Sequence, residues 1–181
     1  MKLYVLATGS SGNASIVQGK HENIALDFGL SYSKWHNLLE KNNLELPHEY
    51  FITHEHGDHL NQSGINRLFD KYKGLYFHTN RGTFETEDFT IQAFLVPHDI
   101  ENHGFVIVEK DTNEKLVYIT DCSSMYQTVK HYQDLLSNAD IYALEANYDE
   151  QYIENPDILV QMNYKYNVFR GMMRHTSKQE S

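Results

Sequence analysis

Apolar and polar residues alternate along this chain with two periods, which predict strands interleaved with helices. Short apolar or alternating runs bounded by turn residues predict strands at 2–7, 14–18, 23–27, 49–53, 75–78, 89–96, 104–109, 115–120 and 141–145. Apolar residues at helical spacing predict a helix capped by Ser31 or Ser33 that ends near Asn43, and further helices over 61–72, 126–136 and about 148–169. Such an alternation is typical of a layered α/β domain.

Composition limits the class of protein. The 181 residues suit one domain, and a hydrophobic fraction of 40% excludes disorder as the main description. No apolar run approaches the roughly 18 residues of a membrane span, and the N-terminal segment is typical of a strand rather than a secretory signal. The single cysteine, Cys122, excludes an internal disulfide framework and is expected to serve packing. We therefore expect a cytoplasmic protein with no membrane partner.

Charge limits the partners. Fifteen Lys and Arg against 25 Asp and Glu give a net charge of -10. This balance excludes a basic surface extensive enough for nucleic acid to wrap around, so any phosphate must bind at a local site. Eleven His beside one Cys direct any metal site toward imidazole and carboxylate ligands.

The strongest chemical signal is Thr53-His54-Glu55-His56-Gly57-Asp58-His59, directly after a predicted buried strand. In an extended segment His54 and His56 point to the same side and can bind one ion together. Gly57 allows a sharp turn that brings Asp58 and His59 toward a second ion. A zinc-protease helix motif is excluded because its second His would fall at Asp58. A solvated polar loop is disfavoured by the density of ligand types.

This segment resembles the HxHxDH signature of the metallo-β-lactamase superfamily, and other residues resemble it in the same order along nearly the whole chain. Asp27 resembles the buried structural Asp of that family, and His98, in Val96-Pro97-His98-Asp99, resembles the third His of the first metal. Asp121, in Ile119-Thr120-Asp121, resembles the Asp that bridges both metals, and His175 resembles the last His. Three further segments are similar to the YycJ/WalJ-like branch, which is related to RNase Z and the β-CASP-type nucleases: Gly9-Ser10-Ser11-Gly12-Asn13, Glu145-Ala146-Asn147-Tyr148-Asp149 and the late His-x-Ser.

The resemblance implies a metallo-β-lactamase-like αββα sandwich, formed as one compact domain over residues 1–181. Only Thr176–Ser181 follow His175, too few residues for the C-terminal strand and helix usual in this branch. The stretch between His59 and His98 is short, and we expect no separate β-CASP domain.

The resemblance also implies a two-metal site. His54, His56 and His98 would hold one ion, Asp58, His59 and His175 the other, and Asp121 would bridge them. Zinc suits these ligands best, and manganese or iron is also compatible with them. The candidate catalytic residues are Asp58, Asp121 and His175. Metal coordination lowers the pKa of water toward about 7, so a metal-bridging hydroxide needs no dedicated general base.

Other residues are expected to support the site. Asp27 is expected to stabilise the floor of the site rather than bind metal, and Glu145 and Asn147 to orient the ligands. The Gly9–Asn13 loop is compatible both with a backbone cradle for phosphate and with a plain hairpin turn. Arg174 and Lys178, next to His175 in the chain, are candidate donors to a phosphate.

The favoured function is a dinuclear metal-dependent hydrolase, either a phosphodiesterase or a nuclease, acting on nucleic acid or a nucleotide. The alternatives are a small-molecule (cyclic nucleotide) phosphodiesterase, a thioester or lactone hydrolase, and a non-catalytic metal-binding protein. The substrate, the metal used in the cell and self-association stay open, because one such site serves many leaving groups.

Overall fold

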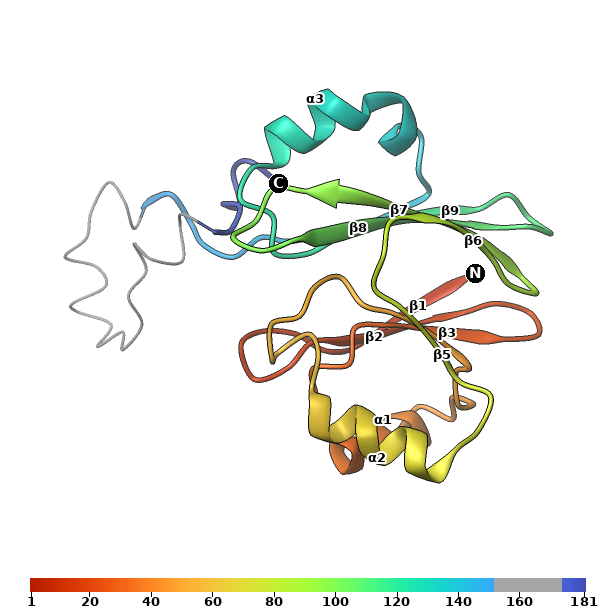
Figure 1. Ribbon diagram of the computed structural model, residues 1–181. Helices are drawn as coiled ribbons and strands as arrows, with labels where there is room; N and C mark the ends of the chain where they lie inside the picture. The colour runs from red at the N-terminus through yellow and green to blue at the C-terminus, as the bar shows by residue number, and fades with distance from the viewer. Residues whose placement is uncertain (152–173) are drawn as a thin grey trace. The chain divides into compact units, whose positions relative to one another are not determined.

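The computed structural model describes residues 1–151 and 174–181 (Figure 1). The helix expected over 148–169 therefore falls almost entirely outside the described residues. The chain divides into two compact units, and each is described by itself. The first comprises Met1–Gln92 and Val108–Glu114, and the second comprises Ala93–Ile107 and Lys115–Ser181.

The first unit is built on a mixed sheet with the strand order β1-β2-β3-β4-β5. Its strands are β1 (Lys2–Ala7), β2 (Ala14–Gln18), β3 (Asn23–Leu26), β4 (Glu49–Phe51) and β5 (Tyr76–His78). The first three pair antiparallel, whereas β3, β4 and β5 run parallel. The parallel strands are connected by α1 (Tyr32–Lys41) and α2 (Gln62–Lys71), which lie side by side on one face of this sheet (Figure 1). The carboxyl ends of β3 and β4 consequently meet at one edge, the usual location of a site in α/β proteins.

Aromatic packing anchors both helices to this sheet. The rings of Phe28, Trp35 and Tyr50 are fully buried, and their centroids lie 4.9 to 6.1 Å apart. Leu39 of α1 and Leu68 of α2 join the same core. Since each fully buried large side chain stabilises the fold by roughly 1.5–3 kcal/mol, the loops that leave β3 and β4 start from well-packed strands.

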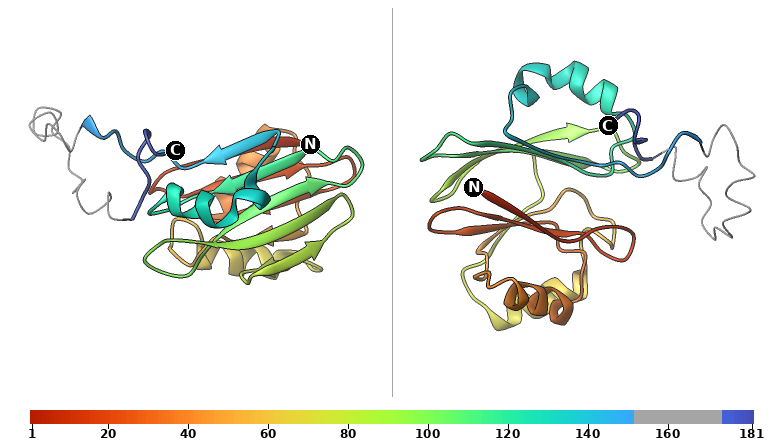
Figure 2. Two further views of the ribbon diagram at one scale, coloured as in Figure 1. Left: turned by 90° about the horizontal axis from the view of Figure 1, so that it is seen from above. Right: turned by 180° about the vertical axis from the view of Figure 1, so that it is seen from behind.

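The second sheet has the strand order β10-β9-β8-β7-β6. Its strands are β6 (Gly82–Glu85), β7 (Phe89–Val96), β8 (Asn102–Glu109), β9 (Lys115–Ile119) and β10 (Ile141–Leu144). The helix α3 (Met125–Leu136) connects the parallel pair β9 and β10 and lies over this sheet (Figure 2). Its N-cap is Ser124, whose side chain accepts a hydrogen bond from the Gln127 amide.

The hydrophobic pattern predicted most of these elements to within a few residues. It missed β6, because only Phe84 is half-buried there and the other three residues are exposed, so the strand has no apolar alternation. The strand expected over 49–53 ends at Phe51, which places Thr53 in the loop that follows. No helix in the described residues is long and apolar enough to cross a membrane.

Candidate metal centre

The loop that follows β4 is held by Asp27, which lies just beyond the end of β3. The fully buried Asp27 carboxylate accepts hydrogen bonds from the backbone N–H and the hydroxyl of Thr53, at 2.8 and 2.9 Å. Its other oxygen lies 2.8 Å from Nδ1 of His59. The expected structural position of Asp27 is thus confirmed, because its carboxylate supports both ends of the His54–His59 segment.

These contacts determine which ring nitrogens of two histidines carry a proton. His59 donates from Nδ1 to the Asp27 carboxylate, so Nε2 carries its lone pair. The Thr53 hydroxyl donates its one hydrogen bond to Asp27. It therefore accepts a hydrogen bond from Nδ1 of His54, which lies 3.0 Å away. The same network thus gives both His54 and His59 an Nε2 lone pair, the form in which imidazole binds a metal.

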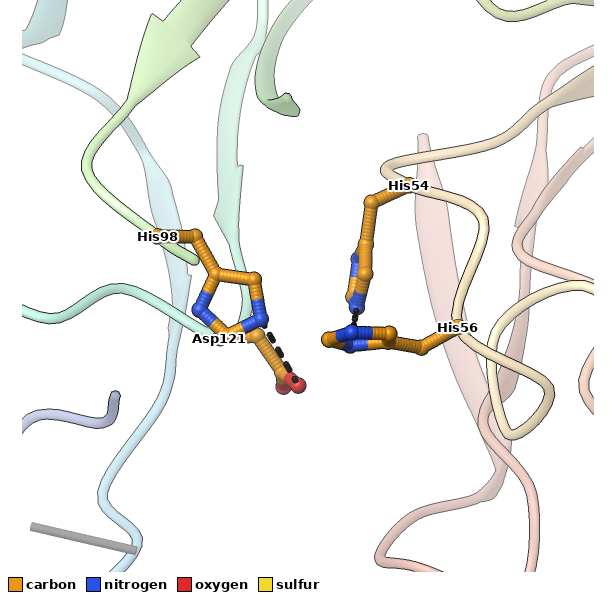
Figure 3. Close-up of side chains that lie close together, drawn as sticks. All are labelled: His54, His56, His98 and Asp121. Atoms are coloured by element: carbon orange, nitrogen blue, oxygen red, sulfur yellow. Dashed lines mark hydrogen bonds and ion pairs between the residues drawn. The ribbon is translucent and has the colours of Figure 1, made fainter. Parts of the chain in front are cut away.

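His54 and His56 meet as the alternation of an extended segment predicts. Nε2 of His54 lies 3.0 Å from Nδ1 of His56 (Figure 3), while Glu55 between them is exposed. Two nitrogens bound tetrahedrally to one zinc at the usual bond length lie roughly 3.3 Å apart. The pair therefore fits two ligands of a single ion.

A tight turn places Asp58 beside His59. The amides of His59 and Leu60 both donate to the carbonyl of His56 at 2.8 Å, and Asp58 Oδ2 lies 3.9 Å from His59 Nε2. Gly29 packs directly on this turn, since a Cβ there would lie 1.7 Å from the Asp58 carbonyl oxygen. Only glycine fits at position 29 without displacing the turn.

The Gly9–Asn13 loop stabilises the turn at Asp58 through hydrogen bonds. The Asn13 amide donates to the Asp58 carbonyl at 2.7 Å, while Gly9 N–H donates to Asn13 Oδ1 and Gly12 N–H to the Gly9 carbonyl, both at 2.9 Å. Asn13 Nδ2 also lies 2.9 Å from His59 Nε2. Three of the amides that a phosphate cradle would use are engaged inside the protein. Of the two interpretations that the sequence left open, the structure favours a hairpin turn that supports Asp58.

In the second unit, His98 follows β7 and is oriented by the backbone. Its Nδ1 donates to the Arg174 carbonyl at 3.1 Å, and its Nε2 lies 3.0 Å from the Asp99 carboxylate. Nε2 also lies 4.0 Å from Oδ2 of Asp121 (Figure 3). Burial lowers the pKa of His98 by more than Asp121 and Asp99 raise it. The neutral ring, which is the metal-binding form, is thereby favoured.

Asp121 and His175 come together with Glu145 in the same unit. These three residues each offer a ligand atom within 4.8 Å of the others. His175 Nδ1 lies 2.5 Å from Glu145 Oε1 and 4.0 Å from Asp121 Oδ2, and the other Glu145 oxygen accepts from the Cys122 amide at 2.8 Å. Glu145 therefore contacts His175 as Asp27 contacts His59, an arrangement compatible with its expected supporting position.

Each unit thus gathers a part of the predicted ligand set. The first brings together His54, His56, Asp58 and His59, and the second brings together His98, Asp121 and His175. Sequence reasoning missed Thr53 and the carbonyl of Arg174 as partners of ligand rings, because a threonine hydroxyl and a backbone carbonyl leave no motif. Arg174 and Lys178 are paired with carboxylates, Arg174 with Asp99 at 3.0 Å and Lys178 with Asp149 at 3.6 Å.

Comparison with solved structures identifies the fold. Human tRNase Z, short form, superimposes with a TM-score of 0.67 at 19% identity, covering 99% of this chain and 86% of that chain. The metallo-β-lactamase fold protein YhfI from Bacillus subtilis gives 0.57 at 18% identity over 82% and 73% of the two chains. A diphosphatase from the PhnP family gives 0.59 at 15% identity over 91% and 83%. The chain has the metallo-β-lactamase fold, and the predicted fold class is confirmed.

Comparison with curated sequences is more specific. Exodeoxyribonuclease WalJ of Streptococcus pneumoniae is 28% identical over 183 residues, covering 85% of this chain and 65% of the relative. Exodeoxyribonuclease YycJ of Bacillus anthracis is 26% identical over 171 residues, covering 80% and 62%. The chain therefore spans less than two thirds of the length of these relatives, and no family model matches it. The resemblance to YycJ/WalJ-like proteins is confirmed, and the fold and donor chemistry together support binding of divalent metal.

Proposed function

We propose that this chain is a metal-dependent hydrolase of the nuclease or phosphodiesterase type, acting on a phosphodiester of nucleic acid or a nucleotide. One observation carries the proposal: contacts at Nδ1 orient the rings of His54, His59, His98 and His175, and three of these rings belong to groups of His, Asp and Glu side chains that could hold a metal ion. The similarity to exodeoxyribonucleases WalJ and YycJ supports a phosphodiester substrate.

The proposed ligands are divided between two ions. His54, His56 and His98 would hold one ion, Asp58, His59 and His175 would hold the other, and Asp121 would contribute to both. The donor set of imidazoles and carboxylates suits zinc best and also accommodates manganese or iron. Two divalent ions, when bound, lower the pKa of the attacking water and stabilise the attacking and leaving oxygens of a phosphodiester.

Exposure separates the proposed catalytic residues from two of the other proposed ligands. The side chains of Asp58, Asp121 and His175 are 31%, 16% and 19% exposed, so solvent and substrate can reach them. The side chains of His59 and His98 are each 1% exposed. Asp27, Thr53 and Glu145 contact the imidazoles of His59, His54 and His175 at Nδ1 and so orient these rings before substrate arrives.

A smaller substrate is the second candidate, favoured by the net charge of -10. A polymeric nucleic acid needs several phosphate contacts, so its affinity falls steeply with salt, whereas a cyclic or short substrate is nearly insensitive to salt. The proposed location is the cytoplasm, a proposal supported by the single cysteine, which is buried as a free thiol.

The test is a substrate panel with the metal-loaded protein: an aryl phosphodiester, single- and double-stranded DNA, RNA, cyclic nucleotides, a thioester and a lactone. We expect phosphodiester cleavage that Asp121→Asn abolishes. Asp111→Asn, which changes an exposed carboxylate paired with Lys20, is the matched control and is expected to keep full activity. Turnover confined to the thioester or the lactone would contradict the proposal.

The assignment of His175 has its own test. His175→Ala is expected to lower the metal content by about one equivalent and to reduce phosphodiester turnover by at least a hundredfold, because a ligand of the second ion is lost. Elemental analysis and steady-state kinetics measure both. His131→Ala, in α3, is the control. Full metal content and full activity in His175→Ala would show that another group completes the site.

A further inference from the structure

Asn102, the first residue of β8, contacts the turn that carries Asp121. Its side chain is fully buried, and its Nδ2 donates to two successive backbone carbonyls, that of Thr120 at 3.0 Å and that of Asp121 at 2.9 Å. The opposite orientation of the amide would set its oxygen against both carbonyl oxygens. The contacts therefore fix the orientation of the carboxamide as well as its position.

The turn at Asp121 needs such support. Asp121 has a backbone φ of 48°, in the left-handed region that residues other than glycine rarely adopt. The chain leaves β9 at Ile119 and turns within two residues, and the Ser123 amide then donates to the Pro97 carbonyl at 2.8 Å. Conformations of this kind persist only where the surroundings over-determine them. Asn102 supplies two of the hydrogen bonds that do so.

The carbonyl oxygen of the Asn102 side chain indicates that this residue has a role beyond stability. Within the described residues, its Oδ1 is buried without a hydrogen-bond partner. A buried acceptor left in this state costs about 1–3 kcal/mol, and an apolar side chain of similar shape would avoid the cost. A residue that served packing alone would not need an amide here. The benefit must come from the two bonds that Nδ2 makes.

We infer that Asn102 is a positioning residue, whose amide sets the direction of the Asp121 carboxylate through the backbone of its turn. The inference rests on the proposed function, in which Asp121 is a metal ligand. Asn102 itself contacts only the backbone of the turn, and it acts through Asp121. Neither the HxHxDH signature nor the other motifs of the sequence include this residue.

The experiment compares Asn102→Ala with Asn23→Ala. Asn23 is also buried, and its Nδ2 likewise donates to a backbone carbonyl, that of Glu45 at 2.9 Å, but this contact holds the first residue of β3 and neither residue is a proposed ligand. Both variants lose a buried amide, so both are expected to lower the melting temperature of the metal-free protein. Only Asn102→Ala is expected to weaken zinc retention, by roughly tenfold in competition with a chromophoric chelator.

Kinetics on an aryl phosphodiester give a second readout. Asn102→Ala is expected to lower kcat with little change in KM, since a misdirected Asp121 impairs the transition state more than substrate binding. Asn102→Ser keeps one donor and is expected to lie between the wild type and Asn102→Ala, and it decides the question if Asn102→Ala does not fold. Wild-type zinc retention in the folded variants would overturn the inference. Failure of the wild type itself to bind metal or cleave any phosphodiester would instead overturn the proposed function.

Discussion

Two aspartates with left-handed backbone, Asp27 and Asp121, lie at strand ends and bear on the candidate ligands. Their φ values are 61° and 48°. Aspartate tolerates this region better than most residues, and here it turns a carboxylate back toward the strand end. The Asp27 carboxylate contacts Thr53 and His59, whereas Asp121 is itself a proposed metal ligand. The same backbone conformation thus occurs at a supporting residue in one unit and at a proposed metal ligand in the other.

Asp27→Ala is expected to destabilise the metal-free protein by roughly 3–5 kcal/mol. The substitution removes a fully buried carboxylate and leaves the amide and hydroxyl of Thr53 and the Nδ1–H of His59 without their acceptor. Urea denaturation monitored by circular dichroism measures the loss. Asp111→Ala, at an exposed ion pair, is the control and is expected to leave the denaturation midpoint unchanged. A loss of unfolding free energy below about 1 kcal/mol in Asp27→Ala would mean that the His54–His59 segment does not depend on Asp27 for its stability.

At the scale of elements, two hairpin turns of the first unit are joined by Asp88. The Asp88 carboxylate accepts from the amides of His21 and Glu22, at 2.6 and 3.1 Å, and lies 2.8 Å from His21 Nδ1. Glu22 in return accepts from the Asp88 amide at 2.8 Å. A Cβ at Gly19 would lie 2.4 Å from Asp88 Oδ2, so glycine permits the approach. The turn between β2 and β3 is thereby held to the turn between β6 and β7.

This contact predicts a loss of stability in acid. Burial raises the pKa of Asp88, but the hydrogen bonds from His21 and Glu22 outweigh it and leave the pKa below its ordinary value. A pKa that is lower in the folded than in the unfolded state, where it is about 3.9, stabilises the protein at pH values above 3.9. This stabilisation is lost as the pH falls through the pKa of the folded state. The difference in urea midpoint between wild type and Asp88→Asn is therefore expected to be largest near pH 6 and to shrink below about pH 4. A difference that stays constant from pH 6 to pH 3 would contradict the argument.

Sequence reasoning succeeded where the signal is local. The apolar periods predicted most strands and helices, and the His54–His59 segment was found because its ligands lie within six positions of one another. The partners of those ligands could not be found in this way. Asp27 and His59 are 32 residues apart, and Glu145 and His175 are 30 apart, so their pairing exists only in the fold. Asn102 had no sequence signal at all, because a single buried amide belongs to no period or motif.

At the scale of the whole molecule, the proposed ligands come from both compact units. His56 belongs to the first and His98 to the second, although the resemblance assigns both to one ion. Ligand binding stabilises a folded chain by an amount that grows with affinity, roughly 4 kcal/mol at a thousandfold excess over the dissociation constant. An ion shared as proposed would therefore make the contributions of these two residues interdependent.

The last prediction tests that dependence by a double-mutant cycle. Zinc is expected to raise the melting temperature of the wild type, and His56→Ala or His98→Ala alone should each remove the part of the rise that the ion of His54, His56 and His98 supplies, because loss of either ligand releases that ion. The double variant is then expected to lose little more than either single variant, since the ion is already gone; such non-additivity is the signature of groups that act as one unit. Differential scanning calorimetry with zinc and with chelator measures all four proteins. His21→Ala, outside the proposed ligands, should keep the full rise. Additive losses from His56→Ala and His98→Ala would show that the two residues serve separate ions.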